Sequence, residues 1–390
     1  MAAAGTHAIH KHAFFGSMAI YIGTAVGAGI FSIPYAMAQF GFFPSLFYLL
    51  LLTAVNILIN LFYGEVVLRT GNDCQMAGYA GKYIGQWGKR IGFLVLISAN
   101  YGAMLVYAVG VGQFLFELLG PYLGGSPFAY SLAFFAIMSA IIFRGLKAIS
   151  GVEMGMSALF IAIVAFLAII GGPSVHWDNF SAFHPQNFFL PYGVILFAIG
   201  AVSVIPLMKK TMDFNHQLRN FKKSIVISSL ITFAIYLTFA FVVIGITGEK
   251  TSPEGIVGLS GILGKKVLVI GSIFGFLTMA TSFLTLGLVL RHLYEFDYKI
   301  PRLWAWLLTC IVPLLIFLLG LPGFIQLIGI IGAIIGGLRG ILVIMMWQRA
   351  KRRGDRQPEY SLRLPLLIPI LLYLVFFAGL IYQAAYSLGG

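Results

Sequence analysis

The first long apolar segment of this chain contains the stretch Gly23-Thr24-Ala25-Val26-Gly27-Ala28-Gly29-Ile30-Phe31-Ser32-Ile33-Pro34. Each glycine weakens a helix by about 1 kcal/mol relative to alanine, and proline removes a backbone hydrogen-bond donor. In hydrocarbon, backbone that leaves the helix must be buried in protein or line a wet cavity. The stretch therefore predicts an interrupted membrane helix with a polar group beside it.

A similar arrangement of glycine and proline recurs much later, in Phe197-Ala198-Ile199-Gly200-Ala201-Val202-Ser203-Val204-Ile205-Pro206. Gly27-Ala28 precedes Ile33-Pro34 in the early stretch, as Gly200-Ala201 precedes Ile205-Pro206 in the late one. The spacing differs by one residue, so the match is one of position more than of sequence. Interrupted segments at corresponding places in two halves indicate the central site of a membrane transporter.

The composition is that of a membrane protein. Of the 390 residues, 60% are hydrophobic and only 9% are charged. Segments of roughly 20 apolar residues, each long enough to cross a bilayer, follow one another almost without pause. We therefore predict an all-α polytopic protein with about 11 transmembrane helices. The predicted segments are 14–40, 43–68, 91–119, 128–143, 150–172, 188–208, 224–247, 265–291, 303–320, 323–347 and 365–387.

The net charge is +13, and the basic residues behind it are distributed unequally between the two sides of the membrane. With the N-terminus in the cytoplasm, the basic residues in predicted outer loops are Lys250, Lys265 and Lys266, and Arg339 falls inside an apolar segment. All other Lys and Arg residues fall on the inner side, as the positive-inside rule requires. The pattern predicts a multi-pass protein of the plasma or cytoplasmic membrane, with a cytoplasmic N-terminus. Its surface partner is the lipid bilayer, not nucleic acid.

Two charged residues in the apolar segments are candidates for an inner gate. Glu65 lies four residues before Arg69 and can pair with it along one helix face. Alternatively, Glu65 turns inward and accepts hydrogen bonds from unwound backbone. Arg339 can extend to the inner interface or pair with Glu65.

Uncharged polar residues at membrane depth leave two interpretations open. Asn100 and Tyr101 either form hydrogen bonds between helices or contact a substrate. The hydroxyls of Thr278, Thr281 and Ser282 either bond to the preceding turn of their own helix or face a ligand.

The two interrupted stretches resemble the first and sixth helices of the leucine-transporter-like fold. The matching residues are Gly23 to Ile30 with Pro34, and Phe197 to Gly200 with Ile205-Pro206. The closest resemblance is to the amino acid/auxin permease and aromatic amino acid permease branches of the amino acid–polyamine–organocation superfamily. It implies a 5+5 inverted repeat with broken helices 1 and 6 plus one accessory helix. The implied divisions are a cytoplasmic tail (1–13), a first repeat (14–172), an outer loop (173–187), a second repeat (188–348), a basic inner loop (349–364) and an accessory helix (365–390).

The resemblance also implies a substrate site. In that superfamily an amino acid's carboxylate lies against freed N–H groups of the first break, here Ala28 and Gly29 with Gly27 nearby. A helix N-terminus suits an anion because it has open donors and partial positive charge. The ammonium is held by carbonyls, here those of Phe197, Ala198 and Gly200. The predicted substrate-binding set is completed by Thr24, Ala25, Asn100, Tyr101 and Ser203.

Sodium-coupled relatives hold an ion between the first and eighth helices. The corresponding oxygens are the carbonyls of Gly23, Val26 and Thr278 and the hydroxyls of Thr281 and Ser282. Five oxygens without a full charge suit a hard monovalent cation. Aromatic amino acid permeases are generally proton-coupled, which keeps the proton as an alternative. The lysine that some proton-coupled relatives carry in the fifth helix is absent, which favours sodium.

These observations predict a secondary active transporter that imports a neutral L-amino acid by cation symport through alternating access. A proton-coupled symporter or exchanger is the alternative. The predicted pocket has no acidic side chain, which disfavours lysine and arginine as substrates. A channel would need a continuous polar path, and an enzyme would need a motif such as His-Glu-x-x-His or Gly-x-Ser-x-Gly, which the sequence lacks. We expect no catalytic residue and no cofactor other than a bound sodium ion.

Overall fold

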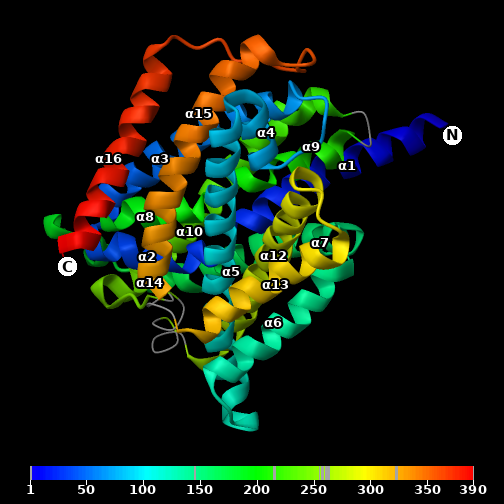
Figure 1. Cartoon of the computed structure of the whole chain (residues 1–390). Coiled ribbons are helices and arrows are strands. Elements are labelled where there is room, and N and C mark those ends of the chain that lie inside the picture. The colour runs from blue at the N-terminus through cyan, green and yellow to red at the C-terminus, as the bar shows by residue number, and fades with distance from the viewer. Residues whose placement is uncertain are drawn as a thin grey trace.

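The computed structural model describes residues 2–144, 146–213, 217–253, 255, 259, 264–320 and 324–389. Every regular element within these residues is helical (Figure 1). The helices are α1 (Ala2–Ala25), α2 (Gly29–Phe40), α3 (Phe42–Leu68), α4 (Met76–Ile84), α5 (Gln86–Leu123), α6 (Pro127–Arg144), α7 (Leu146–Gly171), α8 (Leu190–Ala198), α9 (Ile205–Asp213), α10 (Phe221–Thr247), α12 (Lys265–His292), α13 (Arg302–Leu318), α14 (Phe324–Ile330), α15 (Gly336–Arg353) and α16 (Leu367–Gly389). The shorter helical segments are η1 (Gly172–Ser174), η2 (Trp177–Phe180), η3 (Pro185–Asn187), η4 (Val202–Val204), η5 (Leu218–Asn220), η6 (Gly248–Lys250), η7 (Leu293–Asp297) and η8 (Ile331–Ile335).

The membrane-spanning segments agree with the sequence prediction. Within the described residues, eight helical segments are long and apolar enough to cross a membrane, and α1 with α2 forms one further, bent span. Two shorter apolar helices, α13 and α16, complete the set. Each of these segments overlaps one predicted segment, and α5 extends beyond its prediction at both ends.

The first predicted interruption is confirmed between α1 and α2. The apolar part of α1, Ala13–Ala25, and α2 are bent by 51° at the break. The helical ladder of α1 ends where Val26 N donates to Ile22 O at 2.8 Å, and Gly27 N then turns back to Ala25 O. Pro34 lies inside α2 without ending it. The small residues, and not the proline, therefore make the break.

The second predicted interruption is also confirmed. Helix α8 ends at Ala198, a short non-helical segment covers 199–201, and η4 leads into α9 at Ile205. Pro206 lies in the first turn of α9, where its missing N–H has no partner to lose. The chain therefore crosses the bundle as two half-helices joined by a short non-helical segment, in which Ile199 and Ala201 are buried.

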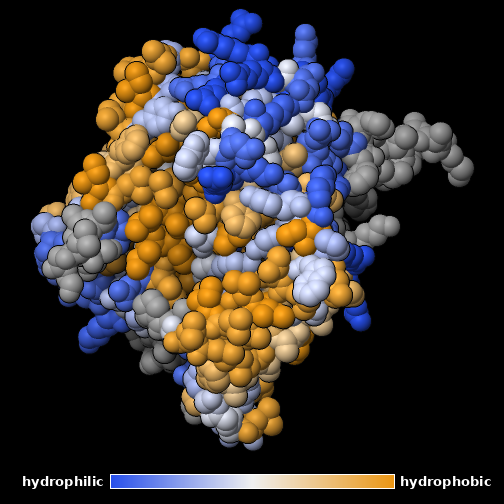
Figure 2. All heavy atoms as spheres, in the orientation of Figure 1, coloured by the Kyte–Doolittle hydropathy of each residue, from blue (hydrophilic) through white to orange (hydrophobic). Residues whose placement is uncertain are grey.

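The surface of the bundle matches a lipid environment. Large apolar side chains such as Phe47, Ile169 and Ile381 are exposed on the outer helices. Figure 2 shows a broad hydrophobic surface, with hydrophilic residues gathered at the end of the bundle that carries α4 and the end of α15. Helix α16 packs along one edge of the bundle beside α15 (Figure 1).

Candidate functional site

The two interruptions meet inside the bundle. Helix α2 packs against α8, and Gly29 at the start of α2 lies against Ala198 at the end of α8. A Cβ atom on Gly29 would lie 2.5 Å from Cα of Ala198, so the two backbones approach as only glycine allows. A Cβ on Gly27 would lie 2.8 Å from Ser282 Oγ and 2.9 Å from the Tyr107 hydroxyl. Gly29 thus allows close contact with the backbone of α8, and Gly27 allows close contact with two hydroxyl groups.

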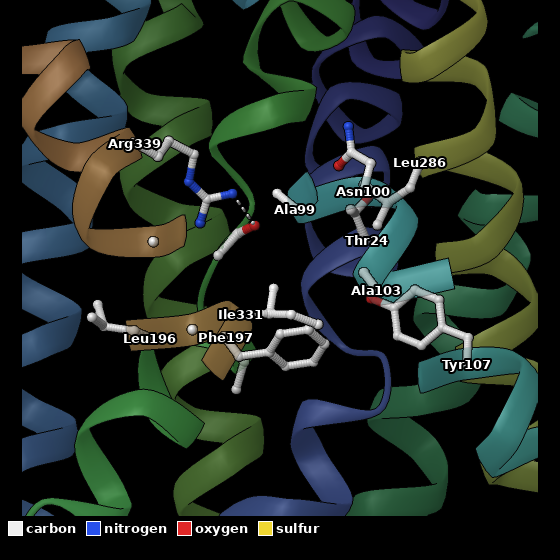
Figure 3. A pocket seen from close by; sticks show the side chains of 14 residues that line it. Thr24, Ala99, Asn100, Ala103, Tyr107, Leu196, Phe197, Leu286, Ile331 and Arg339 are labelled. Atoms are coloured by element: carbon white, nitrogen blue, oxygen red, sulfur yellow. Dashed lines mark hydrogen bonds between the residues drawn. The ribbon is translucent and has the colours of Figure 1, made fainter. Parts of the chain in front are cut away.

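A buried pocket adjoins these breaks (Figure 3). Its walls come from α1, α5, α8, α12, η8 and α15, and it is lined by Thr24, Ala99, Asn100, Ala103, Tyr107, Leu196, Phe197, Ala198, Gly200, Leu286, Ile331, Gly332, Gly336 and Arg339. The cavity volume of about 30 Å³ is room for only one or two water molecules. The walls must separate before the pocket can hold an amino acid.

Five of the predicted substrate residues line this pocket: Thr24, Asn100, Phe197, Ala198 and Gly200. Four others, Ala25, Gly27, Ala28 and Gly29, form the first break and the last turn before it. Tyr101 and Ser203 are buried but are not among the lining residues. The Tyr101 hydroxyl instead bonds to the Tyr294 hydroxyl at 2.7 Å and to Leu308 O at 2.8 Å. Tyr101 thus follows the alternative of a hydrogen bond between helices.

The first break supplies open donors. Among the backbone hydrogen bonds of the described residues, none is donated by Ala28 N or Gly29 N, at the start of α2. Unpaired N–H groups at a helix N-terminus attract anions, because the helix dipole adds partial positive charge. This end of α2 is therefore chemically suited to a carboxylate.

A tyrosine that the sequence analysis did not select joins the two breaks. The Tyr236 hydroxyl of α10 lies 2.5 Å from Ala25 O and 2.8 Å from Ala198 O. A phenol carries one proton, so it can donate to only one of these carbonyls at a time. The other carbonyl retains capacity for a second donor. The sequence gives no signal for this role of Tyr236, because both of its partners are backbone carbonyls, which every residue has.

The remaining carbonyls predicted to hold an ammonium are also engaged. Phe197 O accepts a bond from Gly200 N at 3.1 Å. Gly200 O accepts a longer bond of 3.5 Å from Arg339 Nη1. The Gly200 carbonyl is thus the acceptor most easily released to a new donor.

The hydroxyls predicted to hold sodium behave in two ways. Thr278 Oγ1 donates to Gly275 O, and Thr281 Oγ1 donates to Thr278 O and Leu277 O, all within α12. Ser282 Oγ instead reaches across to α1, where it lies 2.9 Å from Gly23 O and 3.3 Å from Thr24 O. The structure therefore places Ser282 against Gly23, whereas none of these hydroxyls bonds to Val26 among the side-chain hydrogen bonds of the described residues.

The predicted Glu65–Arg339 pair is not formed in this structure. The fully buried Glu65 carboxylate forms an ion pair of 2.8 Å with Arg69, because a partner one helical turn away is already in reach. The same carboxylate also accepts bonds of 2.8–2.9 Å from the Trp347 indole, the Ser361 hydroxyl and Leu362 N. Glu65 thus forms the helix-end ion pair, and it also accepts a bond from the non-helical segment that follows α15. Arg339 lies at the pocket and not at this cluster.

A polar cluster beside the second break was also missed. The Tyr21 hydroxyl accepts bonds from Asn56 Nδ2, Asn60 Nδ2 and Ser229 Oγ at 2.8–3.2 Å. Asn56 Nδ2 also donates to Ile199 O at 2.8 Å. Two asparagines four residues apart in an apolar segment were the available signal. The cluster joins α1, α3 and α10 to the residue that follows α8.

Just after the first break, Phe31 of α2 is part of an aromatic cluster. The Phe31 ring lies 5.2–5.9 Å, between centroids, from the rings of Phe114, Phe239 and Phe274. Phe31 is fully buried. Phe31 of α2 thus packs among rings of α5, α10 and α12, two residues after the start of α2.

Comparison with protein families identifies the chain. Residues 10–383 match the tryptophan/tyrosine permease family. The chain belongs to this family. Tyrosine-specific transport system 1 of Haemophilus influenzae is 27% identical to this permease-family chain over 362 residues, covering 88% of the chain and 90% of the relative. Glutamine transporter 2 of Aliivibrio fischeri is 24% identical over 363 residues, covering 90% and 92%. The family and these two relatives confirm the prediction that the protein is an amino acid transporter and not an enzyme.

Solved structures confirm the fold. MhsT in complex with L-phenylalanine matches this permease-family chain with a TM-score of 0.66 and 15% identity, covering 94% of the chain and 98% of MhsT. Mhp1, a nucleobase-cation-symport-1 family transporter in a closed conformation with bromovinylhydantoin bound, also has a TM-score of 0.66 and 15% identity, with coverage of 95% and 90%. The predicted leucine-transporter-like architecture, with broken helices 1 and 6, is therefore confirmed.

Proposed function

We propose that the protein imports a neutral L-amino acid by symport with a cation, most simply sodium, through alternating access. The observation that carries this proposal is the meeting of the two interrupted helices at Gly29 and Ala198, beside a buried pocket. Such a meeting brings the free donors of one half-helix next to the carbonyls that end another. A zwitterion needs both kinds of group at once.

Each end of the substrate then has a binding partner. The carboxylate accepts hydrogen bonds from Ala28 N and Gly29 N at the start of α2. The ammonium donates to the carbonyls of Phe197, Ala198 and Gly200, where it displaces the long bond from Arg339. Neither end requires an ionised side chain, which suits a site at membrane depth, where charges are costly.

The coupling cation is proposed to bind between α1 and α12. The Gly23 carbonyl and Ser282 hydroxyl, 2.9 Å apart, are the strongest support, because oxygens at this separation can share one small cation. Val26, Thr278 and Thr281 complete the proposed set. The alternative is proton coupling, and its support is that Thr278 and Thr281 already donate within their own helix.

Tyrosine and glutamine are the first substrates to test, because two relatives are named for transporting them. Both side chains are neutral and end in a polar group containing oxygen. The pocket lining has no acidic side chain, so a cationic side chain would have no counter-charge there.

The test is uptake of radiolabelled amino acids into proteoliposomes. We expect accumulation above equilibrium when sodium is higher outside, and none when the sodium gradient is absent. Accumulation that follows a pH gradient without sodium would favour the proton-coupled alternative. No gradient-driven accumulation of any amino acid, from protein shown to be folded, would contradict the proposed function. We also propose a cytoplasmic N-terminus in the cell membrane, which labelling of single cysteines from either side would check.

A further inference from the structure

A buried cation reaches the central pocket without a carboxylate partner. Arg339 lies on α15, is 9% exposed and lines the pocket. Its one hydrogen bond among the described residues is the 3.5 Å contact from Nη1 to Gly200 O. None of the ion pairs found within the described residues includes Arg339.

Such a group is costly unless something pairs with it. A guanidinium carries five N–H donors and stays charged, so one long bond leaves most of its capacity unused. Removing a charge from water without a partner is strongly unfavourable. The guanidinium therefore favours any ligand that brings an oxygen acceptor into the pocket.

A second residue with an unused donor lines the same pocket from another helix. Asn100 of α5 is 1% exposed, and its Nδ2 has no hydrogen-bond partner. In Figure 3, Asn100 and Arg339 lie at the same end of the pocket on opposite walls, with Phe197 and Ile331 toward the other end. The nearby Thr24 hydroxyl is already bonded to Ile20 O at 2.7 Å. Arg339 and Asn100 thus both lie at this end of the pocket, and each has donor capacity that the hydrogen bonds of the described residues leave unused.

We propose that Arg339 and Asn100 bind an oxygen atom of the substrate's side chain and so determine which amino acids are accepted. This inference rests on the proposed function. The α-carboxylate has its own donors at Ala28 and Gly29, so the oxygen at Arg339 belongs to the side chain. When the ammonium takes the Gly200 carbonyl, the guanidinium loses its one partner and the side-chain oxygen replaces it. A phenol, a carboxamide or a carboxylate fits this chemistry, whereas a cationic side chain is repelled.

The experiment compares substrates that differ at the side-chain oxygen. Uptake of one radiolabelled amino acid is measured in the presence of unlabelled competitors. Tyrosine is compared with phenylalanine and glutamine with norleucine, because the second member of each pair lacks the side-chain oxygen. Glutamate and lysine are added as competitors with charged side chains. The variants are Arg339→Gln, Arg339→Lys and Asn100→Leu. Arg349→Gln serves as control, since Arg349 is an exposed arginine on the same helix. Thermal unfolding in detergent establishes that each variant is folded.

We expect wild type and Arg349→Gln to prefer the oxygen-bearing member of each pair. Arg339→Gln should weaken binding of that member by on the order of 10- to 100-fold, as for a lost bond to a charged group, and change phenylalanine binding less than about threefold. Arg339→Lys should retain part of the preference, and Asn100→Leu should reduce it even if Arg339→Gln does not fold. The glutamate and glutamine arms show whether a charged or a neutral oxygen is preferred.

Three outcomes would overturn the inference while leaving the proposed function intact. In the first, the wild type does not prefer the oxygen-bearing competitors. In the second, the variants keep the wild-type preference. In the third, the variants lose affinity for phenylalanine and tyrosine equally, which would assign Arg339 to a step common to all substrates. Failure of wild-type protein to accumulate any amino acid would instead contradict the proposed function itself.

Discussion

Gly29 touches Ala198 so closely that a Cβ atom on the glycine would lie 2.5 Å from the alanine Cα and Cβ. This contact joins the start of α2 to the end of α8, and therefore the two interruptions to each other. The neighbouring atom is backbone, so the space cannot be regained by rotating a side chain. The absence of a side chain at residue 29 is a requirement of the site.

Gly29→Ala should consequently damage the site. The methyl group forces the half-helices apart, which we expect to cost about 1–3 kcal/mol of stability, as overpacking typically does, and to abolish most uptake. Gly155→Ala on α7 is the matched control, because a Cβ there meets nothing within 4 Å. Thermal unfolding and proteoliposome uptake check both variants. Normal uptake by folded Gly29→Ala would show that the close contact is dispensable.

Tyr236→Phe should loosen the connection between the two breaks. Its hydroxyl is shared between Ala25 O and Ala198 O. Without it, Ala25 O keeps its bond from Gly27 N, but the buried Ala198 carbonyl loses its tyrosine donor. We expect a stability loss of about 1–3 kcal/mol and a weaker apparent substrate affinity. Tyr373→Phe, on the peripheral helix α16, should change neither quantity. If Tyr236→Phe unfolds and transports like the wild type, the bridging role is wrong.

Ser282→Ala should act on the cation and not on the amino acid. Ser282 Oγ reaches Gly23 O across the interface between α12 and α1. Without it we expect the sodium concentration for half-maximal uptake to rise by about tenfold or more, as for a lost contact to a charged group. Thr309→Ala is the control, because the Thr309 hydroxyl bonds within its own helix to Ala305 O. An unchanged sodium dependence in Ser282→Ala would argue against the proposed site.

Glu65→Gln should destabilise the end of the bundle that carries α4. The buried carboxylate holds the Arg69 guanidinium and irregular backbone at Leu362. Breaking a buried ion pair from one side typically costs about 3–5 kcal/mol, and Arg69 is only partly exposed. Glu117→Gln, at an exposed position of α5, should be neutral. Thermal unfolding of the two variants makes the comparison, and equal midpoints would contradict this role of Glu65.

The interruptions were predictable because glycine acts on its own backbone, whereas Pro34 lies inside α2 without ending it. Gly27, Gly29 and Gly200 mark the breaks whatever surrounds them, and the apolar segments mark the spans. Asn100 and Tyr101 show the limit of such reasoning. Adjacent residues on a helix point about 100° apart. Asn100 lines the pocket and the Tyr101 hydroxyl bonds to Tyr294, but the sequence did not say which of the two would do so.

Partnerships across the bundle were not predictable. Tyr236 bonds to backbone carbonyls, which carry no signature in the sequence. The sequence allowed Glu65 to pair with either Arg69 or Arg339, and in the structure the nearer Arg69 forms the ion pair. Arg339 then remains at the pocket, a position that only its contact with Gly200 reveals.

The claim that free backbone groups hold both ends of a zwitterion has a direct test. Competition of uptake is measured with a transported amino acid, its methyl ester, its N-acetyl derivative and the amine that lacks the carboxylate. The account predicts that only the unmodified amino acid competes at low concentration, because each derivative loses the partner of one break. Equal competition by the ester or by the N-acetyl derivative would contradict it.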